Sequence, residues 1–303
     1  MIATIDQLVQ LTDARLQPLL QFDHNYSLDV LRLDKIHAII SGNKWFKLKY
    51  SLLHAIDERK KGIITAGGAY SNHIVATACA CSILGMESIG IIRGEKPGKL
   101  SCTLQHAADW GMKFEFVSRS AFRDRWKMDS IVHEFASEFH FVEDGGKNER
   151  GMKGAEEILH LVQPKNYDYI CCAIGTGTTM AGIIASVENT QSVIGVSCLK
   201  IDQEQNEFSS FFEQISKEGG NFSIIYDYHF GGYAKYNREL IQFMNDLYAR
   251  YNIPTDFVYT GKLFYAIWDL VKKSYFRSGS RILLIHSGGL QGNCSLPAGT
   301  LLF

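Results

Sequence analysis

Little net charge and no long apolar run mark this sequence, and each absence excludes a class of protein. The chain of 303 residues has a formal net charge of −1, which argues against a nucleic-acid surface that depends on positive charge. No apolar run approaches the ~20 residues needed to span a bilayer. The first residues, Met1 to Asp6, lack the basic segment and apolar core of a secretory signal. We therefore expect a cytoplasmic protein that binds neither nucleic acid nor membrane.

Metal-ligand spacings are also missing. The ten histidines include no pair at ligand spacing on a predicted helix, and Cys79-Ala80-Cys81 is not a metal spacing. The seven cysteines lie at positions 79, 81, 102, 171, 172, 198 and 294. Because their number is odd and most neighbours are apolar, we expect buried free thiols in a reducing compartment rather than disulfides or zinc. No metal site is expected.

Short strand-like runs alternate with longer helix-like segments along the chain. The predicted strands are residues 36–40, 62–66, 88–92, 114–117, 167–174, 193–199, 223–226 and 281–286. The predicted helices are residues 45–56, 74–84, 100–110, 121–139, 155–161, 180–187, 203–217, 238–251 and 263–274. This order indicates an α/β protein with parallel sheets and right-handed crossovers.

The length of the chain favours two domains, or one large α/β unit with an insertion. Glycines become frequent at positions 145, 146, 151 and 154, and we place a crossing between domains there. The predicted division is a large domain of residues 1–44 plus 146–303 and a small α/β domain of residues 45–145.

Lys44 is the first candidate for chemistry. It follows a predicted strand and a Ser-Gly turn, and it precedes a predicted helix. Such junctions direct side chains into the crevice at the carboxyl ends of parallel strands. A lysine that is desolvated there can lose its proton and attack an aldehyde. The alternative is a solvated surface charge, which is what most lysines are.

Two glycine-rich turns follow predicted strands. In Gly175 to Thr179, glycines and three threonines precede a helix, which is typical of an anion site. The turn lacks GK[ST] and the Gly-x-Gly-x-x-Gly spacing, which argues against a triphosphate loop and a dinucleotide fingerprint, so a compact phosphate monoester fits better. The alternative is a glycine-rich turn with a structural role only. In Gly67 to His73, Ser71 and Asn72 stand at a helix start, where they could also be ordinary N-cap residues.

Six motifs occur in a fixed order: SGNK at 41–44, AGGAYSNH at 66–73, GTGTTMAG at 175–182, FGGY at 230–233, VYTGK at 258–262 and IHSGG at 285–289. Over residues 28–295 the chain resembles the tryptophan-synthase-β-like pyridoxal-phosphate enzymes. Within them it is similar to the 1-aminocyclopropane-1-carboxylate deaminase/D-cysteine desulfhydrase family. The resemblance implies a two-domain, three-layer αβα fold of PLP fold type II with parallel-rich sheets. It also implies pyridoxal 5′-phosphate as cofactor, held mainly by the large domain, and a homodimer.

The resemblance also implies roles for single residues. Lys44 would be the Schiff-base lysine, and Lys47, one turn on, has no such role. Asn72 would hydrogen-bond the ring oxygen of the cofactor, and Ser71 would be the nucleophile or proton-transfer group. The residues assigned to the cofactor are Lys44, Asn72, Gly175, Thr176, Gly177, Thr178, Thr179 and Thr260. Those assigned to a small amino-acid substrate are Ser71, Asn72, His73, Tyr233 and Tyr259, although large aromatics often only pack.

Thr260 separates two reactions within the family. The cyclopropane deaminases have a glutamate there, beside the pyridine nitrogen, and a carboxylate keeps that nitrogen protonated. A hydroxyl leaves the ring a weaker electron sink, which suffices for β-elimination of thiolate. We therefore expect a D-cysteine desulfhydrase-type lyase that gives a 2-oxo acid and ammonia. The alternatives are deamination of 1-aminocyclopropane-1-carboxylate and a non-catalytic protein that binds pyridoxal phosphate. Whether Ser71 or Lys44 moves the Cα proton stays open.

Overall fold

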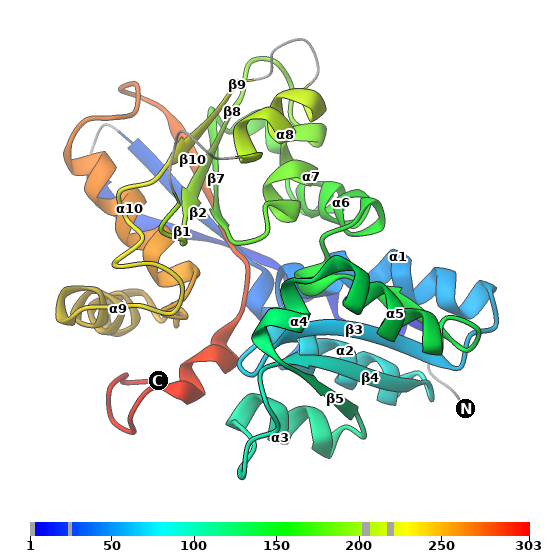
Figure 1. Ribbon diagram of the computed structural model, residues 1–303. Coiled ribbons are helices and arrows are strands. Elements are labelled where there is room, and N and C mark those ends of the chain that lie inside the picture. Colours follow the sequence, from blue (N-terminus) through cyan, green and yellow to red (C-terminus); the bar gives the residue numbers. More distant parts are fainter. Residues whose placement is uncertain (1–3, 24–25, 202–206, 217–220) are drawn as a thin grey trace.

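The computed structural model describes residues 4–23, 26–201, 207–216 and 221–303, and its strands form two sheets (Figure 1). The larger sheet has the strand order β1-β2-β10-β7-β8-β9. Its strands are β1 (Arg15–Asp23), β2 (Tyr26–Arg32), β7 (Tyr169–Ile174), β8 (Ser192–Ser197), β9 (Asn221–Ile225) and β10 (Arg281–His286). All neighbours pair in parallel except β1 and β2, which form an antiparallel hairpin at one edge.

The smaller sheet is parallel throughout, in the order β5-β4-β3-β6. Its strands are β3 (Gly62–Gly68), β4 (Glu87–Arg93), β5 (Lys113–Val117) and β6 (Phe139–Val142). All four strands lie within residues 45–145, the range predicted for the small domain. The domain limits themselves stay a prediction.

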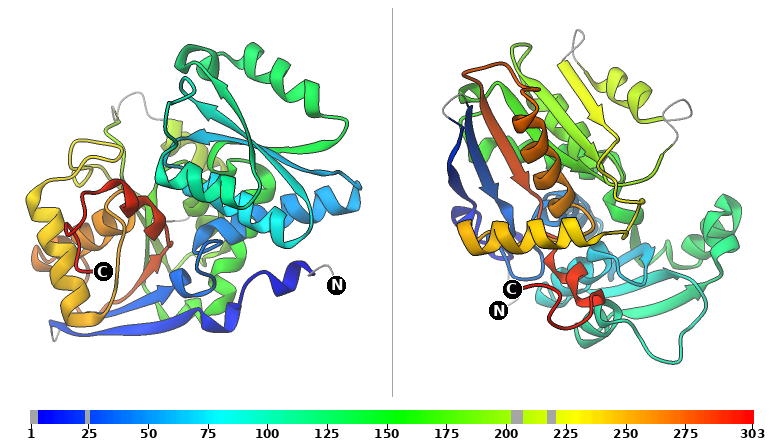
Figure 2. Two further views of the ribbon diagram at one scale, coloured as in Figure 1. Left: turned by 90° about the horizontal axis from the view of Figure 1, so that it is seen from below. Right: turned by 90° about the vertical axis from the view of Figure 1, so that its left-hand side faces the viewer.

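Helices cover both faces of the larger sheet (Figures 1 and 2). The helices on one side are α9 (Arg238–Tyr251) and α10 (Thr260–Lys272), and those on the other are α1 (Asn43–Asp57), α6 (Glu149–Glu156) and α7 (Thr178–Ser186). Side chains alternate between the two cores, so that Cys171 packs with α10 while its neighbour Cys172 packs with the α1–α7 side. This layering confirms the predicted fold class.

The smaller sheet is covered in the same way. Helices α2 (Asn72–Ile83) and α3 (Cys102–Asp109) pack on one face, and α4 (Arg119–Arg123) and α5 (Arg125–Phe135) on the other. The prediction of one helix over 121–139 was wrong. The side chain of Asp124 accepts a hydrogen bond from the amide of Lys127 and so caps a second helix, and the chain turns into β6 at Phe139.

The predicted strand at 36–40 was also wrong, because the described structure has no strand there and β2 ends at Arg32. His37 gives the physical reason. Its Nδ1 accepts hydrogen bonds from the amides of Ile39 and Ile40, at 3.0 and 2.9 Å. These local bonds take the groups that a strand would offer to a neighbour. Ile36 and Ile40 are nevertheless fully buried, which explains the apolar run.

Other predicted elements differ at their ends. The helix predicted over 155–161 begins earlier, as α6, and continues as a 3₁₀ segment from Glu157 to Leu161. Part of the helix predicted over 203–217 lies outside the described residues, and the described part is α8 (Glu207–Ile215). No helix in the described ranges is long and apolar enough to cross a membrane.

The expectation that every cysteine is a free thiol was wrong for one pair. Cys102, at the start of α3, forms a disulfide with Cys294, in the 3₁₀ segment Leu290–Ser295. The other five cysteines are free and buried. Spacing could not reveal the pair, because the two residues are 192 positions apart and meet only after folding. The bond ties α3 to the segment that follows β10.

Removing this disulfide should lower stability. It closes a loop of 192 residues, and such a cross-link stabilises a native state by about 2–4 kcal/mol through restriction of the unfolded chain. We expect Cys294→Ser to lower the free energy of unfolding by that amount in urea titrations without reductant. A reducing agent should destabilise the wild type to the level of the variant and leave the variant unchanged. Seven titratable thiols in denatured, unreduced wild type would contradict the bond.

Candidate active site

The carboxyl ends of six parallel strands meet at one cavity. Three of these strands, β3, β4 and β6, belong to the smaller sheet, and three, β7, β8 and β10, belong to the larger sheet. In the same order, the cavity-lining residues at or just after the strand ends are Gly68, Arg93, Asp144, Gly175, Leu199 and Ser287. Ligands bind at such strand ends in open α/β sheets. The cavity has a volume of about 620 Å³, within the ~300–1,000 Å³ of small-molecule sites.

Gly42 brings Lys44 to this cavity. Its φ of +64° suits a glycine. A Cβ on Gly42 would lie 1.9 Å from the carbonyl oxygen of Ser287, so no other residue fits without displacing the end of β10. The turn lets α1 begin at Asn43 and places Lys44 in its first turn, where the lysine lines the cavity.

Lys44 is connected to the glycine-threonine turn by hydrogen bonds. Its Nζ donates to Asn43 Oδ1 at 2.7 Å, and Asn43 Nδ2 donates to Thr179 Oγ1 at 2.8 Å. Desolvation lowers the pKa of Lys44 to about 8, although the carboxylates of Asp256 and Asp144 act in the opposite direction. A substantial fraction of the amine is therefore neutral near physiological pH, as a nucleophile requires.

The turn from Gly175 to Thr179 forms one wall of the cavity. Gly177 adopts a left-handed conformation, with φ of +84°, and α7 begins at Thr178. Thr176 and Thr179 line the cavity, whereas Thr178 does not; its hydroxyl lies 3.1 Å from that of Thr176. Backbone amides at the start of a helix and two hydroxyls suit a phosphate group.

Lys47 faces the same turn, a role that the motif comparison did not assign to it. Its Nζ donates to the carbonyl of Gly145 at 3.0 Å and to Thr176 Oγ1 at 3.2 Å. Burial, and then the positive charge of Lys44, lowers the pKa of Lys47 well below its usual range. A phosphate dianion would favour the charged form again. The spacing of three residues, which puts both lysines on one face of α1, was the available signal.

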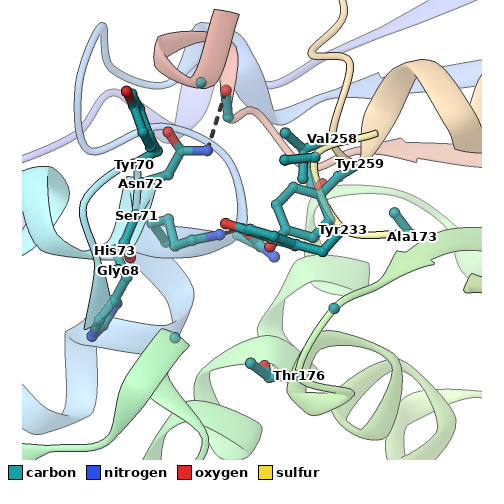
Figure 3. A pocket seen from close by; sticks show the side chains of 18 of the residues that line it. Gly68, Tyr70, Ser71, Asn72, His73, Ala173, Thr176, Tyr233, Val258 and Tyr259 are labelled. Atoms are coloured by element: carbon teal, nitrogen blue, oxygen red, sulfur yellow. Dashed lines mark hydrogen bonds between the residues drawn. The ribbon is translucent and has the colours of Figure 1, made fainter. Parts of the chain in front are cut away.

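Ser71, Asn72 and His73 form the opposite wall (Figure 3). Ser71 occupies the N-cap position of α2, but its side chain makes no capping hydrogen bond, so the hydroxyl is not committed to local structure. Asn72 Nδ2 donates to the carbonyl of Gly289 at 3.2 Å, while its Oδ1 is buried without a partner. His73 Nε2 lies 3.0 Å from Thr65 Oγ1, and burial lowers the pKa of this histidine to about 3, so the ring is neutral.

Tyr233 and Tyr259 lie across the cavity from Ser71 (Figure 3). Their ring centroids are 6.2 Å apart in an edge-to-face arrangement. Tyr259 is largely buried, whereas Tyr233 keeps 44% of its surface exposed. Gly175 makes room for Tyr259, since a Cβ there would lie 2.8 Å from the tyrosine ring. The two rings thus cover the cavity at its solvent side.

Thr260 is not brought to the cavity wall. It is fully buried, and its hydroxyl donates to Asp256 Oδ1 at 2.7 Å. Its place beside a pyridine nitrogen stays a prediction. Ser287, just after β10, is a hydroxyl that does line the cavity. Arg93 and Asp144 are lining residues that were not predicted, because no local motif marks them, and Ser287 lies in the IHSGG motif but was given no role.

These residues fit pyridoxal 5′-phosphate. Lys44 offers an amine of lowered pKa, and the turn at Gly175 together with Lys47 offers a phosphate site. Asn72 Oδ1 is an unsatisfied acceptor that a donor such as a ring hydroxyl could bind. All of them line one cavity, as a single small cofactor requires. Fold and site together define a PLP-type enzyme of the two-sheet α/β class.

Comparison with known proteins agrees. A family model described as "Pyridoxal-phosphate dependent enzyme" matches residues 11–288, and the chain belongs to this family. A Pyrococcus abyssi protein with a provisional assignment as 1-aminocyclopropane-1-carboxylate deaminase is 30% identical over 84% of this chain and 81% of its own length. The bifunctional mitochondrial D-cysteine desulfhydrase/1-aminocyclopropane-1-carboxylate deaminase of Arabidopsis thaliana is 27% identical over 84% and 70%.

A solved structure shares the fold. The crystal structure of an ACC deaminase homologue superposes with a TM-score of 0.78, at 24% identity, and covers 97% of each chain. The family and this fold confirm pyridoxal 5′-phosphate as the cofactor and a tryptophan-synthase-β-like architecture.

The lowered pKa of Lys44 predicts how cofactor uptake depends on pH. Only the neutral amine reacts, so the rate at which apoprotein gains the visible absorbance of bound pyridoxal phosphate should rise about tenfold per pH unit below the pKa. It should level off near pH 8, not near the 10.5 of an ordinary lysine. Asp144→Asn removes a carboxylate that raises this pKa, so its profile should shift to lower pH. A rate still rising at pH 10 would contradict the assignment.

Lys47 should matter for cofactor affinity. A charge-assisted hydrogen bond to a phosphate contributes about 1.5–3 kcal/mol, so Lys47→Met should raise the dissociation constant for pyridoxal phosphate about 10- to 100-fold in fluorescence titrations. Lys49→Met is the matched control, because Lys49 pairs with Glu157 at 2.6 Å and does not line the cavity. Equal affinities in the two variants would rule out the phosphate contact.

Proposed function

We propose that this enzyme catalyses β-elimination from a small amino acid, in the manner of a D-cysteine desulfhydrase, and releases a 2-oxo acid and ammonia. The observation that carries the proposal is the joining of Lys44 and Ser71 in one cavity with a phosphate cradle. A relative with desulfhydrase activity in its name supports the reaction. The lining residues within the described ranges include one carboxylate, Asp144, and no glutamate.

The residues that line the cavity would have different roles in this reaction. When bound, the cofactor supplies an electron sink for negative charge at the substrate Cα. The first amides of α2, which have no partner inside the helix, and Ser71 suit the α-carboxylate of the substrate. Lys44 Nζ and Ser71 Oγ would be the two candidates to accept the Cα proton, since both residues line the cavity. Tyr233 and Tyr259 would exclude water and hold the departing group.

Deamination of 1-aminocyclopropane-1-carboxylate is the second candidate, because the names of several relatives carry it. The argument from Thr260 against it stays a prediction, since this residue does not line the cavity. What favours elimination is that Asp144, the one carboxylate in the described lining, is influenced more by Arg93 than by Lys47 or Lys44. A non-catalytic pyridoxal-phosphate protein is the third candidate. The uncommitted Ser71 hydroxyl in the cavity favours the two enzymes over it.

We also propose a homodimer, as the resemblance to the family implies, and a cytoplasmic location. Five buried free thiols match the cysteine usage of a reducing compartment, whereas the Cys102–Cys294 bond does not. Sedimentation of the holoenzyme tests the first proposal. Thiol labelling of the protein in its own cells tests the second.

Product assays separate the candidates. Holoenzyme is incubated with D-cysteine, L-cysteine and 1-aminocyclopropane-1-carboxylate, and sulfide, pyruvate and 2-oxobutanoate are measured. We expect sulfide and pyruvate in equal amounts. Lys44→Ala should lose both the visible absorbance of the bound cofactor and all turnover, because no other lining amine reaches its position. Formation of 2-oxobutanoate alone would favour the deaminase. No product and no spectral change with any amino acid would favour the non-catalytic protein.

A further inference from the structure

Arg93 is a cavity-lining cation with no assigned task. It is the last residue of β4, and in the parallel ladder it pairs with Gly68, the last residue of β3. Because Gly68 has no side chain, the arginine can lie over the end of β3; a Cβ on Gly68 would be 3.5 Å from Arg93 Nη2. This places the guanidinium beside the segment that leads into Ser71 and Asn72.

An aromatic ring packs against the guanidinium of Arg93 and leaves the N–H donors of the arginine free. The guanidinium carbon of Arg93 lies 5.7 Å from the ring centroid of Phe122, on α4. Cation–π contact of this kind leaves the in-plane N–H groups free for an acceptor. Among the residues that the structure describes, no carboxylate forms an ion pair with Arg93. The side chain is exposed, so a ligand in the cavity can reach it.

In the described part of the chain, the cavity lining holds three cations, Lys44, Lys47 and Arg93, and one carboxylate, Asp144. Of the three cations, Arg93 has the strongest effect on Asp144, although the two side chains do not form an ion pair. Lys44 would hold the cofactor through its amine, and Lys47, which donates to Thr176, would face the phosphate. One cation therefore remains, at the solvent side, and it has donors in the fork geometry that suits a carboxylate.

The α-carboxylate is attached to the reacting carbon, and the first amides of α2 and Ser71 would already satisfy it. Arg93 is exposed, so it is available to the part of a substrate that extends from the reacting carbon toward solvent. We propose that Arg93 is a specificity-determining residue that selects amino acids whose β-substituent ends in a carboxylate. This inference rests on the proposed β-elimination and names its substrate class.

An S-carboxymethyl cysteine fits this class. In its elimination the Cα proton passes to Lys44 or Ser71, and the Cβ–S bond breaks. Its electron pair leaves with sulfur as mercaptoacetate, and the 2-aminoacrylate that is released takes up water to give pyruvate and ammonia. No oxidant or reductant is required.

The test compares S-carboxymethyl cysteine with its neutral isostere, S-carbamoylmethyl cysteine, each as the D and the L form. Pyruvate formation gives kcat/KM, and titration of the cofactor absorbance gives the dissociation constant, in wild type, Arg93→Gln, Arg93→Lys and Arg119→Gln. Arg119 is an exposed arginine on α4 that does not line the cavity, so its variant controls for the loss of one charge.

We expect wild type to prefer the carboxylate substrate by at least about tenfold, in line with one charge-assisted contact at a partly exposed site. Arg93→Gln should reduce this ratio to about one and Arg93→Lys should keep part of it, because a single donor replaces the fork. Arg119→Gln should keep the full ratio. A wild-type ratio near one, or a ratio unchanged in Arg93→Gln, would overturn the proposal.

The two proposals can fail separately. If neither compound yields pyruvate but the ratio of dissociation constants is about tenfold and is lost in Arg93→Gln, the recognition stands and β-elimination falls. If D-cysteine yields sulfide while both ratios are near one, elimination stands and the role of Arg93 falls. Absence of any spectral change with either compound would count against Arg93 as well.

Discussion

The contact between the turn before α1 and the end of β10 is the constraint on which the site depends. Gly42 lies against the carbonyl of Ser287 with no space for a Cβ, and that carbonyl accepts a hydrogen bond from the amide of Asn43 at 3.2 Å. The start of α1 is thereby fixed to a strand of the larger sheet. Because Lys44 and Lys47 lie on the first turns of α1, their distance from the strand ends is set by this one backbone contact. Asn43 extends it to Thr179 at the start of α7.

Two buried amines on adjacent turns give the cavity its electrostatic character. Both lose solvation, which lowers the pKa values of Lys44 and Lys47, and the charge of Lys44 lowers that of Lys47 further. An anion that enters beside Lys47 relieves this cost and leaves Lys44 the neutral partner. The phosphate of the cofactor would therefore have two effects. It would bind beside Lys47, and it would allow the neighbouring amine of Lys44 to remain a nucleophile. Asp144 and Asp256 limit the shift from the other side.

Much of the fold followed from local patterns, because each β-α unit needs its own apolar strand and its own helix period. The prediction failed where one side chain competed with the backbone, as His37 does at Ile39 and Ile40. It also failed where contacts span the whole chain, as in the Cys102–Cys294 bond. The same limit applies at the site. Motifs pointed to Lys44, Ser71 and the Gly175 turn, whereas Arg93 reaches the cavity through strand register alone.

The cavity lies between the strand ends of two sheets, and this division gives a physical basis for separating cofactor binding from substrate preference. The larger sheet contributes Gly175 and Ser287, whose backbone must hold a rigid cofactor, and these positions are packed by Tyr259 and Gly42. The smaller sheet and the turn after β3 contribute Gly68, Ser71 and Arg93 to the other side of the cavity. Buried contacts tolerate few changes, since a Cβ at Gly42 or Gly175 has no room. Arg93 is exposed, and substitutions at exposed positions usually cost little stability. The residues on the buried side of the cavity can therefore change little. At the exposed rim, a substitution of Arg93 can change the proposed preference for one β-substituent over another and leave the buried side of the cavity intact.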